Sequence, residues 1–273
     1  MSSRTGFAIS PVSRWGLRAF VAAVLAFIYV PLVVVVINSF NSDSTFAWPP
    51  SGLTLRWWKA ARNSSGMLDA LGQSVRVGLA ATAVALVLGS LAAFGLHRYR
   101  FFGREAVSLL IILPIALPGI VTGIALSNAF ITILGVGISV WSLVIAHATF
   151  CIVVVYNNVV ARLRRLGGGV EEASMDLGAT RWTTFRLVTV PNLASALLAG
   201  ALLAFALSFD EIVVTTFTAP PDIQTLPLWI YNNLLSRQQA PIVNVAAAGL
   251  ILLSTVPIYL SQRLSGDRGG GRL

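Results

Sequence analysis

Acidic residues gather in one short polar segment between two long apolar runs, and this segment is the first candidate for a functional role. Glu171, Glu172 and Asp176 alternate there with apolar residues. This pattern predicts a short helix that stops at Gly178, and Pro191 stands where the next membrane helix would begin. We expect a folded helix-turn-helix that projects from the membrane and binds a partner protein.

A second acidic pair, Asp210 and Glu211, falls inside an apolar run. A carboxylate at the bilayer centre costs roughly 2.5 to 3.5 kcal/mol, but Asp210 would lie about 27 Å along a span that begins at Asn192, towards its outer end. Either the pair lines a translocation pathway for a cationic substrate, or it is interfacial and bonded to a neighbouring helix and water. We favour the pathway for at least one of the two, and add Trp229 and Tyr231, because ammonium groups pair with carboxylates and aromatic rings.

His147 and Cys151 share one face of another apolar run. The histidine is either a ligand or proton relay in the membrane or a neutral side chain bonded to a neighbouring helix, and we favour the second interpretation. The single cysteine is expected to be a small core residue, without a disulfide or a metal site.

The chain also lacks a phosphate-binding Gly-x4-Gly-Lys-Ser/Thr loop and the His-Glu-x2-His and Gly-x-Ser-x-Gly patterns. We therefore expect no catalytic or metal residues, and energy for any work that this chain does must come from elsewhere.

The elements that position these residues are membrane helices. Apolar residues make up 56% of the chain and charged residues 11%, and the mean hydropathy is +0.81, which excludes an ordinary soluble domain. A helical span needs roughly 20 apolar residues. The sequence thus predicts an all-α integral membrane protein with one domain, residues 1–273, and six spans, at residues 17–37, 73–96, 106–131, 140–160, 192–214 and 243–262. Pro114 and Pro118 predict a kink in the third span, either a hinge or a fit to neighbouring helices.

Basic residues predict the orientation of this bundle. Of the 19 basic residues, the 14 on the side of the acidic segment are Arg4, Arg14, Arg18, Arg98, Arg100, Arg104, Arg162, Arg164, Arg165, Arg181, Arg186, Arg263, Arg268 and Arg272. The other 5 are Arg56, Lys59, Arg62, Arg76 and Arg237. This bias places both termini in the cytoplasm. The net charge of +9 therefore reflects topology, and nucleic acid is not an expected partner, because the chain has no soluble basic face.

The segment from Glu172 to Pro191 resembles the loop signature of permease subunits in binding-protein-dependent ABC importers, Glu-Ala-Ala-x3-Gly-x9-Ile-x-Leu-Pro. The departures are Ser174, Val188 and Val190. The resemblance extends over nearly the whole chain and looks closest to the second permease of spermidine/putrescine importers. The stretches that carry it are PLVVVVINSFN (31–41), HRYRFFG (97–103), WSLVIAHATFC (141–151), LSFDEIVVTTF (207–217) and LPLWIY (226–231). Permeases for aminoethylphosphonate and ferric iron look similar over the same stretches.

This resemblance implies a type I, MetI-like permease fold in the inner membrane of a bacterium, with residues 161–191 as the cytoplasmic coupling loop. In that family the loop forms coupling helices that sit in a groove of an ATPase subunit. The coupling residues would be Glu171, Glu172, Ala173, Ser174, Asp176, Gly178, Ala179 and Pro191. The implied partners are a second homologous permease, two ATPase subunits that carry ATP and Mg, an extracytoplasmic substrate-binding protein and membrane lipid.

The expected function is ATP-driven import, with polyamines as the favoured substrate and no covalent reaction catalysed by this chain. The alternatives are an importer for another small solute and a stand-alone secondary carrier or channel.

Two loops are expected on the outer side of the membrane. Residues 39–70 contain Trp57 and Trp58 and predict an interfacial helix or, alternatively, a dock for the binding protein. Residues 218–241 contain several prolines and are expected to dip back towards the pore as a partial gate.

Overall fold

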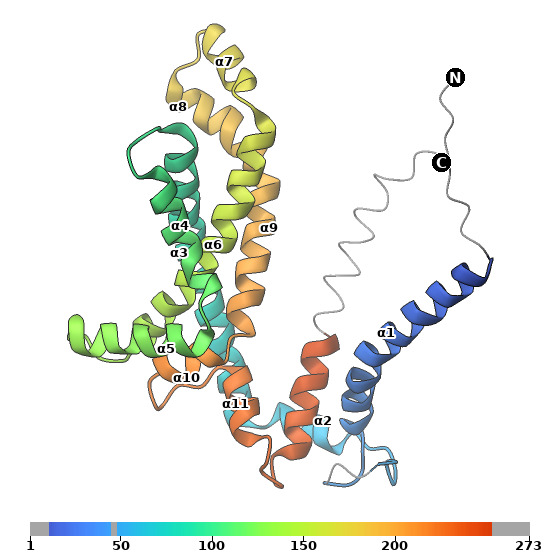
Figure 1. Cartoon of the computed structure of the whole chain (residues 1–273). Coiled ribbons are helices and arrows are strands. Elements are labelled where there is room, and N and C mark those ends of the chain that lie inside the picture. The colour runs from blue at the N-terminus through green and yellow to red at the C-terminus, as the bar shows by residue number, and fades with distance from the viewer. Residues whose placement is uncertain (1–10, 45–47, 253–273) are drawn as a thin grey trace. The chain divides into compact units, whose positions relative to one another are not determined.

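The computed structural model describes residues 11–44 and 48–252, and its regular elements there are helices (Figure 1). The chain divides into two compact units, one formed by Ser65–Tyr231 and the other by the segments on either side of it. The prediction of an all-α protein is therefore confirmed, whereas the single domain stays a prediction.

The flanking unit contains α1 (Pro11–Asn38), α2 (Arg56–Arg62) and a further apolar helix, Ala240–Leu252. α1 is apolar all round and long enough to cross a membrane, as predicted. The short helix expected in the outer loop is α2, where the indole Nε1 of Trp57 donates to the carbonyl oxygen of Asn41 at 2.9 Å. The ring of Trp58 stacks on Phe40 at 5.4 Å between centroids. The second half of the predicted sixth span, residues 253–262, lies outside the described residues.

The central unit is built around three long helical segments: α3 (Ser65–Arg98), α6 (Val140–Leu166) and a continuous run of α8 (Arg181–Thr184), π-helical η2 (Phe185–Thr189) and α9 (Val190–Phe209). Small residues let α3 approach α6 closely: a Cβ built on Gly89 would lie 2.9 Å from the carbonyl oxygen of Ile152. Gly78, Ala81, Ala85, Gly89 and Ala93 are all buried. This face of α3 therefore packs closely against its neighbours.

The third predicted span is broken rather than merely kinked. α4 (Arg104–Ala116) is followed by α5 (Gly119–Asn128) and π-helical η1 (Ala129–Ile133), and the two parts meet at an angle of 109°. The break falls at Leu117 and Pro118, because proline has no N–H to continue the helical ladder and holds its predecessor in an extended conformation. α5 packs on α10 (Val213–Thr218), and a Cβ on Gly123 would lie 2.8 Å from Cδ2 of Phe217.

The fifth predicted span, residues 192–214, is wrong at its C-terminal end. Its helix already begins at Arg181, and α9 ends at Phe209. The chain breaks over Asp210 to Ile212, where Oε1 of Glu211 accepts a hydrogen bond from the backbone N–H of Val214, in the first turn of α10, at 2.8 Å. Within the described residues, four helices are long and apolar enough to span a membrane, or five if the bent pair is one span.

His147 and Cys151 lie in the core of the central unit. The imidazole is fully buried, with Nδ1 at 2.8 Å from Oγ of Ser208 and Nε2 at 2.9 Å from Oγ1 of Thr215. The thiol of Cys151 is also fully buried and donates to the carbonyl oxygen of Ala204 at 3.3 Å. The structure confirms both interpretations: a histidine bonded to neighbouring helices and a small core cysteine.

Candidate functional site

The predicted coupling segment, residues 161–191, forms a helix-turn-helix at one end of the central unit (Figure 1). α6 ends at Leu166, and α7 (Gly169–Asp176) forms the first short helix. Gly178 then adopts a left-handed conformation with φ of 89°, which a glycine reaches without a Cβ clash. Thr180 begins α8 by accepting a hydrogen bond on Oγ1 from the backbone N–H of Thr183 at 3.2 Å. The predicted helix, its stop and the turn are confirmed.

The carboxylate of Glu171 bonds this segment to other helices of the central unit. One carboxylate oxygen forms an ion pair with Arg98, at the last turn of α3, and the other accepts a hydrogen bond from Oγ1 of Thr189, in η2, at 2.5 Å. A second contact joins Ser174 of α7 to Thr184 of α8, with 3.1 Å between the hydroxyl oxygens. α7 is therefore fastened to two of the long helical segments.

The opposite face of the segment is open. Glu172, Ala173 and Asp176 are exposed, and so are the apolar side chains of Leu177, 91% exposed, and Trp182, 68% exposed. Among the other predicted residues, Ser174 and Ala179 are half-buried and Pro191 is exposed near the start of α9. The sequence reasoning missed Leu177 and Trp182, although two large apolar residues in a polar loop are a signal for a protein contact.

The four candidate pathway residues lie on different elements. Asp210 is exposed at the C-terminal end of α9, and Glu211 is occupied in capping α10. Trp229 is buried on α11 (Leu226–Asn233), whereas Tyr231 on the same helix is 64% exposed. Asp210 and Glu211 thus lie at the junction between α9 and α10, whereas Trp229 lies in the wall of a separate cleft.

This cleft lies at the first turns of α3, and we call it the distal cleft. It has a volume of about 510 Å³, and the residues of interest in its wall are Asp69, Gln73, Arg76, Asp222, Gln224 and Trp229. α11 is held against α3 here, because the backbone N–H of Leu226 donates to Oγ of Ser74 at 2.8 Å. α3 has 34 residues and is about 51 Å long, so the distal cleft and the coupling segment lie at opposite ends of the helix. Asp69 and Asp222 were not predicted as site residues, since only the fold brings them to one cleft.

Known proteins resemble this chain over most of its length. Residues 85–268 match the family model described as binding-protein-dependent transport system inner membrane component. The spermidine/putrescine transport system permease protein PotC of Escherichia coli (strain K12) is 35% identical over 92% of this chain and 94% of its own. PotC of Haemophilus influenzae is 34% identical over 93% and 98%, and the putrescine transport system permease protein PotI of E. coli K12 is 34% identical over 76% and 75%.

Solved structures share the fold. A bacterial ABC transporter involved in the import of the acidic polysaccharide alginate has a TM-score of 0.66 at 16% identity, covering 98% of this chain and 100% of that one. A bacterial alginate ABC transporter in complex with an alginate pentasaccharide-bound periplasmic protein has a TM-score of 0.68 at 14% identity, over 95% and 96%. These likenesses confirm the ABC permease fold, and the relatives are permeases rather than enzymes. The chain therefore belongs to the family of binding-protein-dependent transport system inner membrane components and is a multi-pass membrane permease of an ABC importer, homologous to PotC and PotI.

Proposed function

We propose that this permease imports a polyamine such as spermidine or putrescine, using ATP hydrolysis by a partner subunit. The observation that carries the proposal is the 35% identity to a spermidine/putrescine permease along 92% of the chain. The distal cleft supports it, because Asp69, Asp222 and Trp229 supply carboxylates and an aromatic ring, the groups that bind ammonium ions. Arg76 is the one basic residue in its wall.

The coupling segment is the proposed contact with the ATPase. Its open face combines the acidic residues Glu172 and Asp176 with the apolar side chains of Leu177 and Trp182, a composition suited to docking in a groove of another protein. The bonds of Glu171 to α3 and η2 give the mechanism: a partner that displaces α7 also displaces the helices to which α7 is fastened. In this proposal Gly178 and Ala179 form the turn, and Pro191 lies near the start of α9, the helix that receives the displacement.

The complete importer in this proposal contains a second homologous permease, two ATPase subunits with ATP and Mg, and an extracytoplasmic binding protein that delivers the substrate. In this proposal the chain lies in a bacterial inner membrane with both termini in the cytoplasm, and the bias of basic residues towards the side of the coupling segment supports this orientation. Asp210 is the member of the acidic pair that we assign to the pathway, because its carboxylate is exposed whereas that of Glu211 caps a helix.

Reconstitution in proteoliposomes tests this function. Uptake of labelled spermidine or putrescine should require ATP, the ATPase, the companion permease and the binding protein together. Aminoethylphosphonate and ferric iron should not compete. Uptake by this polypeptide alone under an ion gradient would refute the assignment, and transport of aminoethylphosphonate in place of polyamine would refute the substrate.

A matched pair of variants tests the docking face. Leu177→Gln should reduce co-purification of the ATPase and uptake together, because it removes an apolar contact from the proposed interface. Leu235→Gln is the control, since Leu235 is 94% exposed, close to the 91% of Leu177, and lies outside the coupling segment. Equal ATPase recovery with both variants would show that the coupling face is elsewhere.

A further inference from the structure

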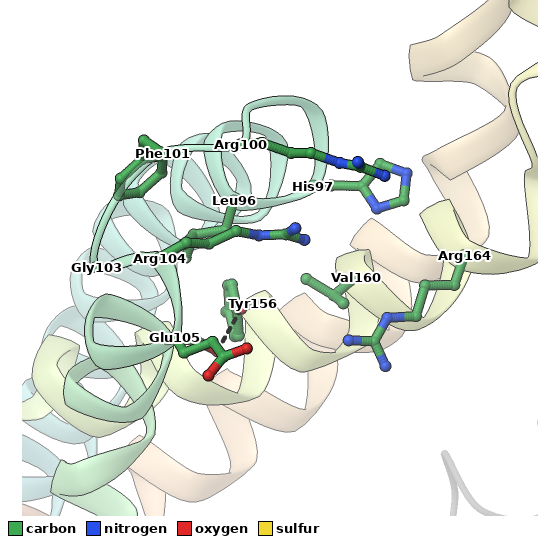
Figure 2. Close-up of a pocket in the computed structure, with 11 residues that line it drawn as sticks. Leu96, His97, Arg100, Phe101, Gly103, Arg104, Glu105, Tyr156, Val160 and Arg164 are labelled. Atoms are coloured by element: carbon green, nitrogen blue, oxygen red, sulfur yellow. Dashed lines mark hydrogen bonds between the residues drawn. The ribbon is translucent and has the colours of Figure 1, made fainter.

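A cleft rich in basic residues opens beside the coupling segment, between the α3–α4 turn and α6. We call it the basic cleft; it has a volume of about 630 Å³, and its wall includes one histidine and four charged residues, His97, Arg100, Arg104, Glu105 and Arg164. Figure 2 shows the side chains of Arg104 and Arg164 reaching into the space between α4 and α6 from opposite sides. The ion pair between Arg98 and Glu171 places this end of α3 next to the coupling segment.

The guanidinium groups of this cleft are available to bind an anion. In the part of the chain that the structure describes, the ion pair that forms is Arg98 with Glu171, and Arg100, Arg104 and Arg164 take no part in one. Glu105 is the one acidic residue in the wall. α4 begins here as well, since Gly103 adopts φ of 83° and Arg104 is the first helical residue, so free N–H groups of the first turn add positive potential. Converging arginines at a helix start are suited to a phosphate group.

An apolar groove continues from the basic cleft along α3 and α4. Its wall is formed by Ala92, Gly95, Leu96, Tyr99, Phe101, Val107 and Ile111, and it shares Leu96 and Phe101 with the basic cleft. From Tyr99 to Ala92 the groove follows α3 for about 10 Å. It is open because Gly95 has no side chain, and a Cβ built there meets nothing within 4 Å. A ligand that occupies both sites must have a charged head and an apolar tail.

We propose that the basic cleft and the apolar groove together bind one anionic phospholipid. The phosphate of the headgroup lies among Arg100, Arg104 and Arg164, and one acyl chain lies in the groove beside Gly95. The position supports a lipid over a soluble phosphate, because the exposed rings of Tyr99 and Phe102 lie in the same turn, and aromatic side chains are typical of the headgroup level. Such a lipid would connect the α3–α4 turn to α6 next to the coupling segment.

Native mass spectrometry of the purified importer complex, titrated with phosphatidylglycerol, tests the site. The unmodified complex should retain one phosphatidylglycerol per copy of this chain in preference to phosphatidylcholine. The double variant Arg104→Gln with Arg164→Gln should bind it roughly 25-fold more weakly, since each basic residue near an anionic surface contributes about fivefold. Gly95→Leu should also weaken binding, because a Cβ at this position meets nothing within 4 Å and the longer side chain would occupy the groove.

The control is the double variant Arg165→Gln with Arg186→Gln, which removes two exposed charges from the same end of the bundle but outside the cleft. It should bind phosphatidylglycerol as the unmodified chain does. Equal weakening in the control would overturn the site, because the effect would then be one of general charge. Displacement of the lipid by inorganic phosphate, with Gly95→Leu unaffected, would show a site for a soluble anion instead. A photocrosslinker introduced at Arg104 that captures the ATPase and no lipid would likewise overturn the proposal.

Discussion

Arg98 and Glu171 form an ion pair that joins the last turn of α3 to the first turn of α7 across 73 residues of sequence. The second carboxylate oxygen of Glu171 is bonded to Thr189, so one side chain holds the coupling segment to two helical segments of the central unit. α7 therefore has an inner face, which is bonded to α3 and η2, and an outer face, which is exposed.

Removing the contacts of Glu171 should impair the coupling of ATP hydrolysis to uptake more than it lowers the stability of the protein. The side chains of Arg98 and Glu171 are 41% and 24% exposed, and ion pairs that are open to solvent contribute about 0 to 1 kcal/mol. Glu171→Gln and Thr189→Val should therefore lower substrate uptake per ATP hydrolysed while the unfolding temperature changes little. Thr216→Val is the control, because its hydroxyl donates within its own helix to Ile212. Unchanged uptake per ATP in both variants would contradict the role of Glu171.

The buried hydrogen bonds of His147 should contribute to stability. His147→Phe removes the partner of Ser208 and one of the two partners of Thr215, whose hydroxyl also donates to the carbonyl oxygen of Glu211, and an unsatisfied buried hydroxyl costs about 1 to 3 kcal/mol. We expect a lower unfolding temperature in detergent. Thr149→Val, which loses a hydrogen bond to Ala146 in the same helix, should change it far less. A stable His147→Phe variant that no longer transports would instead indicate the proton-relay alternative.

Close packing between α3 and α6 should make Gly89 sensitive to one added methyl group. A Cβ there would lie 2.9 Å from the carbonyl oxygen of Ile152 and 3.0 Å from Cβ of Val155. Gly89→Ala should destabilise the protein by about 1 to 3 kcal/mol, as overpacked cores do. Gly72→Ala in the same helix meets nothing within 4 Å and should be neutral or stabilising, since alanine favours helix. Thermal unfolding of both variants side by side provides the comparison, and equal unfolding temperatures would contradict the packing argument.

The distal cleft should influence the apparent affinity for a cationic substrate. Asp69→Asn and Asp222→Asn each remove a negative charge from its wall and should raise the KM for polyamine uptake by roughly fivefold, the effect of about 1 kcal/mol of Coulomb attraction. Asp43→Asn, a change in the other unit, should leave the KM unchanged. Uptake kinetics in proteoliposomes give the measurement, and unaltered KM values in all three variants would remove the distal cleft from the substrate route.

Features that depend on neighbouring residues could be predicted from the sequence. Hydropathy located the long helices, and Gly178 marked the turn after α7, because helix stops and membrane spans are set by local composition and backbone geometry. A distortion at Pro114 and Pro118 was also predicted, but as a kink; the break with its angle of 109° was not, since it depends on how α5 packs against α10.

Contacts between distant segments could not be predicted in this way. Nothing in the order of residues pairs Arg98 with Glu171 or places Asp69 beside Asp222. The extent of the fifth span was misjudged for a related reason: Glu211 lies in an apolar run, but its carboxylate caps a new helix instead of lying within the old one. A single sequence shows which residue types are present, while the partner of each is decided by tertiary packing.

The burial of Cys151 has a practical consequence for experiments on the intact transporter. It is the one cysteine of the sequence, and its side chain is fully buried between α6 and α9. Water-soluble maleimides should therefore react negligibly with the native chain, so that thiols engineered at Leu177 or Asp222 can be labelled without a cysteine-free background. Sealed vesicles of known sidedness would then report directly which end of the bundle faces the cell interior.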